Sequence, residues 1–299
     1  GMYSVTYGGT TADATKEQVT SLSAHYDVSF VEASALPVSI VIPSLESAGQ
    51  PRRLADLLLL LLPYLKLPEV EVFLVIGGTE PFDLSETRAQ LAAQLLDLSC
   101  SINPEEADLL VETRVKVVQP RDEIRIAGLI NAGVRYSGGK FVCVLDDSTS
   151  EIKHRVYGRE GNWLGQLVAY ASHKEIGAVG GLIVDRERAV VISSGRAIRG
   201  DGAVADLHRG ESIESAGYVA RLLGSSNCTA VRLGCFVTEK EIFDEIGGLD
   251  EEISDDLVDL DYGLCLRGKG YRSVVLSQYH FSQRDLYFAE TSDVLTSQS

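Results

Sequence analysis

Short runs of apolar, mostly β-branched residues alternate with longer helix-like stretches through the first half of this 299-residue chain. Continuous apolar runs of this kind are typical of strands buried on both faces of a parallel sheet. Four such strands are expected, over Val38–Pro43 (VSIVIP), Val70–Gly78, Val115–Pro120 and Phe141–Leu145. Helices are expected between them, over Arg52–Leu65, Leu84–Ser99 and Ala127–Tyr136. The alternation predicts an α/β fold, with a Rossmann-like, mostly parallel and doubly wound central sheet flanked by helices.

The rhythm changes after residue 150. The expected elements are a helix (Trp163–His173), a glycine-broken strand (Ile176–Asp185), short strands or loops (Ala189–Gly195 and 203–208), a strand, short helix and Gly-Gly turn (Cys228–Glu252), a helix (Asp259–Leu266) and a last strand (Tyr271–His280). No repeat or low-complexity linker interrupts this order, so we expect one domain over residues 37–283. Residues 1–36 are expected to be an N-terminal extension with one helix (Lys16–His25), and residues 284–299 a polar tail.

Charge and composition narrow the possible partners. The net charge is −16, from 27 basic and 43 acidic residues, and such a surface repels nucleic acid and anionic lipid headgroups. The leucine run Leu57–Leu62 is far shorter than the roughly 20 residues that a membrane-spanning helix needs. The first residues lack the basic and apolar segments of a signal peptide, and the five cysteines are scattered without metal-ligand spacing. We therefore expect a cytoplasmic protein with reduced thiols, no integral membrane segment and no nucleic-acid partner.

Two adjacent aspartates, Asp146 and Asp147, directly follow the fourth expected strand. In an open α/β sheet, ligands bind at the carboxyl ends of the strands, so this pair is expected at the binding edge. Two carboxylates there suit a hard divalent cation, which takes oxygen ligands and can bridge to phosphate. Asp, Ser and Thr also favour turns and helix N-caps, so a purely structural role for this segment stays open.

A second acidic cluster lies at Ser254–Arg272 (SDDLVDLDYGLCLRGKGYR). Asp259 and Asp261 are two residues apart on an expected helix, so only one of them can point squarely at a given site. A carboxylate near a substrate hydroxyl can act as a general base. The alternative is a solvated acidic helix start, which is favourable with the helix dipole.

Several segments together resemble the nucleotide-sugar glycosyltransferases of the large GT-A-fold family often called family two, in particular rhamnosyl- and galactofuranosyltransferases. The segment VSIVIPSLE resembles the family's opening strand pattern VSIVIPTYN, and RIAGLINAGVRYSGGKFVCVLDDS resembles the stretch that leads from an Asn-x-Gly helix to an acidic strand end. The segment AVRLGCFVTEKEIFDEIGGLDEE resembles the acceptor-side stretch ending in GGFDE, and DLDYGLCLRGKGYR aligns without a gap to DVDLCLRLRKAGYR. The resemblance covers roughly residues 37–283, and the order and spacing of these motifs carry it.

The resemblance implies a Rossmann-like half that binds the donor and a second half that binds the acceptor. The donor, a nucleotide-diphospho-sugar, is expected near Ser44, Glu46, Arg125, Asp146 and Asp147, with a divalent metal (Mn²⁺ or Mg²⁺) held by Asp147 and His280. The acceptor, a glycan or lipid-linked glycan, is expected near Trp163, Gly234 and Cys235. Asp259 falls on the aspartate that serves as catalytic base, and the reaction inverts the anomeric carbon.

For some of these residues the sequence leaves alternatives. Trp163 can instead anchor a helix on the core, His280 can be a satisfied histidine at a strand end, and Arg125 can form a surface salt bridge. Asn131 is expected to hold local backbone rather than ligand.

Three departures from the family pattern weaken the expectation of activity. The third carboxylate of the family's acidic strand end is Ser148 here, Ile76 stands where an aspartate reads the base or ribose, and Val258 replaces the glutamate before the catalytic aspartate. A protein that keeps the fold and binds a nucleotide sugar or glycan without turnover is therefore the main alternative. A phosphatase whose strand ends in an hhhhDxDxT motif is a further alternative, but Ser148 stands where that motif needs its second aspartate. A dinucleotide oxidoreductase is disfavoured because no G-x-G-x-x-G follows the first strand.

Overall fold

The computed structural model describes residues 3–7, 10–14, 37–45, 51–78, 81–97, 102–120, 125–155 and 162–283. The expected helix at Lys16–His25, the tail at residues 284–299 and Glu46 lie outside these ranges. Near the N-terminus, β1 (Tyr3–Tyr7) and β2 (Thr10–Ala14) pair antiparallel, which the sequence did not indicate. The division into extension, domain and tail at residues 36 and 283 stays a prediction.

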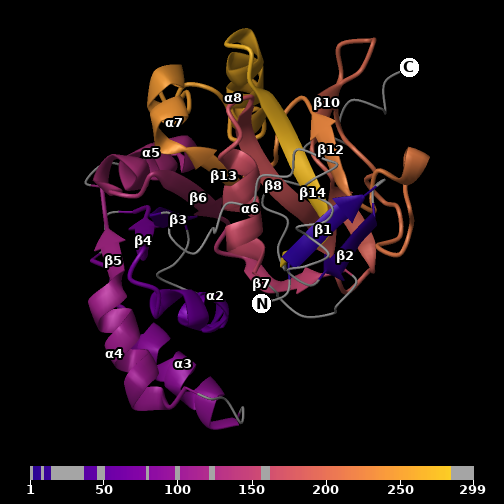
Figure 1. Cartoon of the computed structure of the whole chain (residues 1–299). Coiled ribbons are helices and arrows are strands. Elements are labelled where there is room, and N and C mark those ends of the chain that lie inside the picture. The colour runs from indigo at the N-terminus through magenta and orange to yellow at the C-terminus, as the bar shows by residue number, and fades with distance from the viewer. Residues whose placement is uncertain are drawn as a thin grey trace.

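A sheet of ten strands forms the centre of the molecule (Figure 1). The hydrogen-bonded order is β12-β14-β8-β13-β6-β3-β4-β5, and β7 and β9 pair with β14 and β8. The strands are β3 (Val38–Ser44), β4 (Val70–Ile76), β5 (Val115–Val118), β6 (Phe141–Leu145), β7 (Thr149–His154), β8 (Ile176–Asp185), β9 (Val190–Ser193), β12 (Ser225–Cys228), β13 (Cys235–Glu239) and β14 (Arg272–Gln283). A separate antiparallel pair consists of β10 (Arg196–Ile198) and β11 (Val204–Asp206).

The two halves of the sheet differ in strand direction. The strands β6, β3, β4 and β5 are parallel, as the apolar runs predict. In the other half, β13 is antiparallel to both β6 and β8, whereas β14 is parallel to β8. The sheet is therefore mixed, and the carboxyl ends of β3 and β6 lie side by side at one edge of its parallel half.

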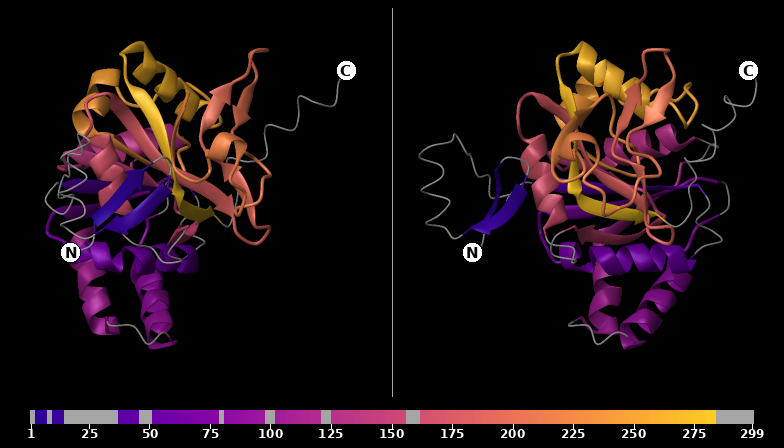
Figure 2. Two further views of the ribbon diagram at one scale, coloured as in Figure 1. Left: turned by 45° about the vertical axis from the view of Figure 1, so that its right-hand side comes forward. Right: turned by 90° about the vertical axis from the view of Figure 1, so that its right-hand side faces the viewer.

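Helices cover both faces of the sheet. They are α2 (Pro51–Leu65), α3 (Ser85–Asp97), α4 (Pro104–Arg114), α5 (Ile126–Tyr136), α6 (Trp163–Ala171), α7 (Lys240–Ile246) and α8 (Val258–Gly268), with a 3-10 turn η3 at Tyr218–Ala220. Buried residues of α2 and α6 share one apolar core with one face of the sheet, and those of α5, α7 and α8 share a second core with the other face. The helices α3 and α4 lie beside α2 as a pair that extends away from the sheet (Figure 2).

Local chemistry explains how α5 is held. A side chain at Gly133 would place its Cβ 2.5 Å from Val41 Cγ1, so only glycine allows α5 to approach the sheet this closely. Asn131 donates to the carbonyl of Leu249 at 2.8 Å and accepts from its N–H at 2.9 Å. The prediction that Asn131 holds local backbone is confirmed. Within the ranges given above, no helix combines the length and apolar character needed to cross a membrane.

Candidate functional site

Three segments meet at the carboxyl edge of the parallel half of the sheet. Asp147 follows β6, Ser44 ends β3, and Arg53 comes from the first turn of α2. The Ser44 hydroxyl donates to one oxygen of the Asp147 carboxylate, and the Arg53 guanidinium donates to the other. The same guanidinium lies 3.8 Å from Asp146, and the side chains of Arg53 and Asp147 are each 13% exposed. Sequence analysis predicted Ser44, Asp146 and Asp147 here but did not include Arg53.

Asp146 and Ser148 build the turn that follows β6. The backbone N–H of Ser148 donates to Asp146 Oδ1 at 2.7 Å, and the Ser148 hydroxyl donates to the same oxygen. The Asp146 N–H donates to the Gly234 carbonyl at 3.1 Å. Ser148 is buried and its hydroxyl is directed back at Asp146. Asp146 therefore has the structural role that its residue type also suggested, while Asp147 faces Ser44 and Arg53.

Burial changes the proton affinity of both carboxylates. It raises the pKa of Asp146, against the opposing effects of Ser148, Arg53 and Arg232. Burial and the neighbouring Asp146 charge, opposed by Arg53 and Ser44, together raise the pKa of Asp147 to about 6. Two adjacent carboxylates with little access to water therefore depend on nearby positive charge to stay ionised.

A second buried charge cluster surrounds Asp259. The Arg196 guanidinium donates to Asp259 Oδ1 at 2.5 Å, and it also donates to the carbonyl of Asp256. Asp206 lies 4.0 Å from Arg196 and 3.5 Å from Arg232, and all of these charged side chains are less than a tenth exposed. Burial raises the pKa of Asp259, and Arg196 and Arg232 oppose that rise. The carboxylate is thus not on a solvated helix start.

Arg232 connects the two clusters electrostatically. It lies in the segment between β12 and β13, and it is only 6% exposed. Its charge lowers the pKa of both Asp146 and Asp259, so it lies within electrostatic reach of both carboxylates. The structure therefore brings the two acidic motifs, more than 100 residues apart in sequence, within electrostatic reach of one buried arginine.

Three other predicted site residues are Asp261, Arg125 and His280. Asp261 is partly exposed, and its pKa is raised by burial and by Asp250. Arg125 precedes α5 and donates to the carbonyl of Ile253 at 3.4 Å. His280 is buried in β14 opposite Lys153 and Leu182.

The residues expected to contact the acceptor are buried. Trp163 is fully buried, and its ring packs edge-on against Tyr64 and Phe281 at centroid distances of 5.4 Å. Its indole therefore serves the core, not a surface that a sugar can reach. Cys235 is also fully buried, in β13 opposite Leu145, and burial raises its thiol pKa well above the ordinary value. Gly234 is buried beside Asp146. A Cβ at this position would lie 2.4 Å from Gln283 Nε2, so the glycine leaves room for the Gln283 side chain.

The described residues fit a divalent metal poorly. The Asp147 carboxylate accepts hydrogen bonds from Ser44 and Arg53, and Asp146 Oδ1 accepts two from Ser148. No group of three or more His, Cys, Asp or Glu side chains that could hold a metal ion occurs in the part of the chain that the structure describes. Burial, together with the positive charges of Arg155, His154 and Arg186, lowers the pKa of His280 to about 4.

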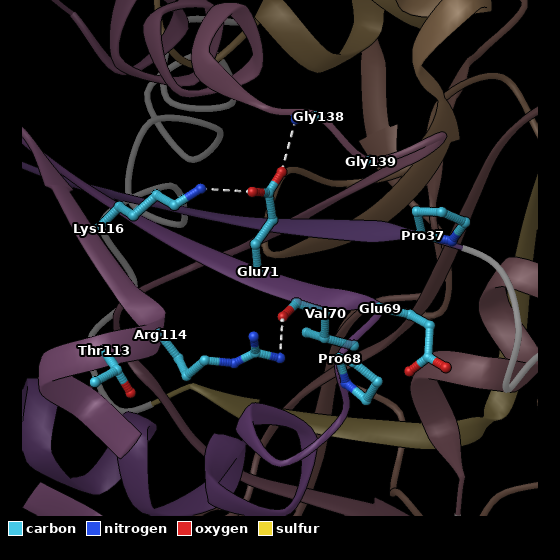
Figure 3. Close-up of a pocket in the computed structure, with 10 residues that line it drawn as sticks. All are labelled: Pro37, Pro68, Glu69, Val70, Glu71, Thr113, Arg114, Lys116, Gly138 and Gly139. Atoms are coloured by element: carbon cyan, nitrogen blue, oxygen red, sulfur yellow. Dashed lines mark hydrogen bonds and ion pairs between the residues drawn. The ribbon is translucent and has the colours of Figure 1, made fainter. Parts of the chain in front are cut away.

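A cavity of about 370 Å³ lies at the opposite, amino-terminal edge of the parallel strands (Figure 3). Its polar groups contact one another: Glu71 accepts from Lys116 at 2.8 Å and from the Gly138 N–H at 2.6 Å. Arg114 donates to the Leu65 carbonyl at the end of α2 at 3.1 Å. These contacts give Glu71, Lys116 and Arg114 a structural role, so the carboxyl edge is the better candidate for a functional site.

Comparisons with known proteins support the fold. No protein-family model matches the chain. Over 169 residues it is 32% identical to the uncharacterized protein y4gI of Sinorhizobium fredii (strain NBRC 101917 / NGR234), a match that takes in 54% of this chain and 17% of that protein. This chain thus spans a small part of that relative.

Two solved structures are similar to this chain over most of its length. The mannosyltransferase PcManGT from Pyrobaculum calidifontis, in complex with GDP-Man and Mn²⁺, has a TM-score of 0.50 and 12% identity over 89% of this chain and 64% of that one. GalNAc-T7 with UDP, GalNAc and Mn²⁺ has a TM-score of 0.50 and 16% identity over 85% of this chain and 45% of that one. The chain has the mixed α/β fold of the GT-A glycosyltransferases.

Proposed function

We propose that this chain is a glycosyltransferase that moves a sugar from a nucleotide-diphosphate donor to a hydroxyl group of a glycan or lipid-linked glycan. One observation carries the proposal: Asp147, Ser44 and Arg53 converge from three segments at the sheet edge where folds of this kind bind ligands. The two solved neighbours hold GDP-Man or UDP with GalNAc, which supports a donor of this class.

On the donor side, we assign Ser44, Asp146, Asp147 and Arg53 to the diphosphate and the ribose. Glu46 and Arg125 remain proposed donor contacts on the resemblance alone. The leaving diphosphate gains negative charge as the bond to the sugar breaks, and a planar guanidinium can neutralise that charge through paired hydrogen bonds. Arg53 is the described cation at this edge that contacts both carboxylates.

On the acceptor side, we assign the general base to Asp259 and not to Asp261. The carboxylate takes the proton from the acceptor hydroxyl, the oxygen attacks the anomeric carbon, and the bond from that carbon to the diphosphate breaks on the opposite face. Inversion follows from this single displacement. Asp259, and not Asp261, falls on the catalytic aspartate that the family resemblance implies, and burial raises the pKa of its carboxyl, which makes the carboxylate a stronger base. Gly234, whose carbonyl accepts from the Asp146 N–H, remains a proposed acceptor contact.

A divalent cation is the expected partner of the diphosphate from the resemblance, and both solved neighbours contain Mn²⁺. The described residues fit it poorly, because Arg53, Ser44 and Ser148 already donate to both oxygens of Asp147 and to Oδ1 of Asp146. We therefore derive no step through a metal, and a role of Asp147 and His280 as its ligands stays a prediction.

Calorimetry with UDP- and GDP-sugars, with Mn²⁺ and with EDTA, followed by an assay for released nucleoside diphosphate, tests the proposal. We expect donor binding, turnover in the presence of acceptor, and a loss of turnover without a loss of binding in Asp259→Asn. The exposed Asp244 gives a matched control, since Asp244→Asn makes the same change on α7 at a side chain that is 62% exposed. Donor binding with turnover that Asp259→Asn leaves unchanged would refute Asp259 as the base.

One observation favours a second candidate, a protein that binds a nucleotide sugar or glycan without catalysis. Asp259 is 5% exposed and held by Arg196, so an acceptor hydroxyl has to reach it past a tight ion pair. Binding of a donor with no release of nucleoside diphosphate, under every metal condition, would favour this candidate.

A further inference from the structure

We infer that Arg53 supplies, from within the chain, the positive charge that a divalent cation would otherwise bring to the Asp146–Asp147 pair, so that the diphosphate binds without a metal. This inference rests on the proposed function, because it specifies how the same site receives its ligand.

The position of the Arg53 guanidinium is the first observation that supports this inference. The Arg53 guanidinium donates to Asp147 and lies 3.8 Å from Asp146, so it occupies the space between the two carboxylates that a bridging cation would need. The side chain is 13% exposed, which leaves it buried enough to be fixed and open enough for a ligand to meet it. A metal ion at the same oxygen atoms would have to displace or repel this guanidinium.

The side chains around the two carboxylates do not complete a metal-binding site. Ser148 brings a hydroxyl where a third carboxylate would serve a metal, and its hydroxyl is directed at Asp146. His280 lies directly opposite Lys153 in the sheet, and this positive neighbour disfavours a cation beside it. This edge of the sheet thus offers two carboxylates and an arginine: too few oxygen ligands for a hard divalent cation, and one guanidinium that can bind phosphate.

The charge of Arg53 also offsets the repulsion between the carboxylates and a bound diphosphate. Two largely buried carboxylates repel a diphosphate, and the charge of Arg53 offsets that of Asp147, which it contacts, and part of that of Asp146, which lies 3.8 Å away. A guanidinium has five N–H donors, so it can keep a bond to Asp147 and still donate to phosphate oxygens. The site can therefore receive an anion without an added cation.

The test uses the full chain with UDP and GDP as nucleotide probes and Mn²⁺ as the metal probe, measured by calorimetry. In the wild type we expect the nucleotide dissociation constant to differ by less than about twofold between EDTA and Mn²⁺. In Arg53→Gln we expect nucleotide affinity in EDTA to fall at least about tenfold and Mn²⁺ affinity without nucleotide to rise at least about tenfold, because the carboxylates are released.

Two further variants keep the test sharp. Arg52→Gln makes the same change at the exposed neighbouring residue of α2 and is expected to behave as the wild type in both titrations. Arg53→Lys keeps the charge without the fork, and is expected to retain nucleotide binding in EDTA at a reduced affinity. Thermal unfolding of each variant shows whether a loss of binding reflects a loss of fold.

The inference is overturned if wild-type nucleotide binding needs Mn²⁺, or if Arg53→Gln changes neither the EDTA titration nor the Mn²⁺ titration. A different result would refute the proposed function instead: no nucleotide binding under any condition. In that case the Mn²⁺ titration alone still tests whether Arg53 occupies the position of a cation beside Asp146 and Asp147. A rise in Mn²⁺ affinity on Arg53→Gln supports its occupation of the cation position, and no rise overturns it.

Discussion

The buried pair of Arg196 and Asp259 gives the sharpest stability prediction. Opposite charges 2.5 Å apart attract by roughly 6–7 kcal/mol at an effective dielectric constant of about 20, and desolvation offsets much of this attraction. Removing one partner leaves the other charge buried, and Arg196→Met should therefore cost about 3–5 kcal/mol of the free energy of unfolding. Urea denaturation followed by circular dichroism measures the loss as a lower transition midpoint.

A matched control separates burial from pairing. Arg199 and Asp201 lie 2.6 Å apart, but their side chains are 60% and 58% exposed. Arg199→Met removes an ion pair of almost the same length, and we expect it to leave the urea midpoint nearly unchanged. If Arg196→Met costs no more than Arg199→Met, the claim that a buried charge network holds Asp259 is wrong. If Arg196→Met does not fold, the double variant Arg196→Met with Asp259→Asn should recover folding.

The cost of Arg196→Met should also depend on pH. Burial already raises the pKa of Asp259 in the folded state, and loss of Arg196 raises it further. A carboxyl whose folded pKa lies above its unfolded value binds its proton more tightly in the folded state. Its stabilising contribution is full below the unfolded pKa and is lost as the pH rises through the folded pKa. The variant should therefore be less destabilised at about pH 5 than at about pH 8, and the double variant should lack this dependence.

Three further outcomes are expected. Gly133→Ala should cost about 1–3 kcal/mol, because its Cβ would overlap Val41, whereas Gly268→Ala on α8, with no neighbouring atom within 4 Å, should be neutral; equal urea midpoints would contradict this. Trp163→Ala should cost about 3–5 kcal/mol and lower the thermal midpoint, and an unchanged midpoint would show that the indole is not a core residue. Asp259→Asn should lower turnover by about 10²–10⁴-fold in a nucleoside-diphosphate release assay, with donor affinity unchanged; full activity would remove it from the base role.

The parallel half of the fold could be predicted because fully buried strands leave continuous apolar runs. The strands β3 and β6 contain no exposed position, and their expected and observed bounds differ by at most one residue. By contrast, α4 and β7 were not predicted. The helix α4 buries only Ala107 and Val111, and β7 contains a single apolar residue, Ile152, so neither has a strong period. Asn103 followed by Pro104 was a signal for the start of α4, and in the structure Asn103 accepts from the N–H of Glu106 at 2.7 Å.

The candidate site was predictable only for its acidic half. Asp146, Asp147 and Ser44 follow strands directly, so the rule for carboxyl ends places them together. Their cationic partners come from far along the chain: 94 residues separate Arg53 from Asp147, and 63 separate Arg196 from Asp259. An arginine in a helix or a short strand has no local pattern that distinguishes a buried partner from a surface residue, and only the fold brings these pairs together.

The central claim is that a nucleotide diphosphate binds at the carboxyl edge of β3 and β6, and a crystal structure of the chain with UDP or GDP tests it most directly. We predict diphosphate oxygens within about 2.7–3.2 Å of the Arg53 guanidinium, beside Ser44 and Asp147. A nucleotide bound elsewhere, for example in the cavity beside Glu71 and Lys116 (Figure 3), would contradict the account.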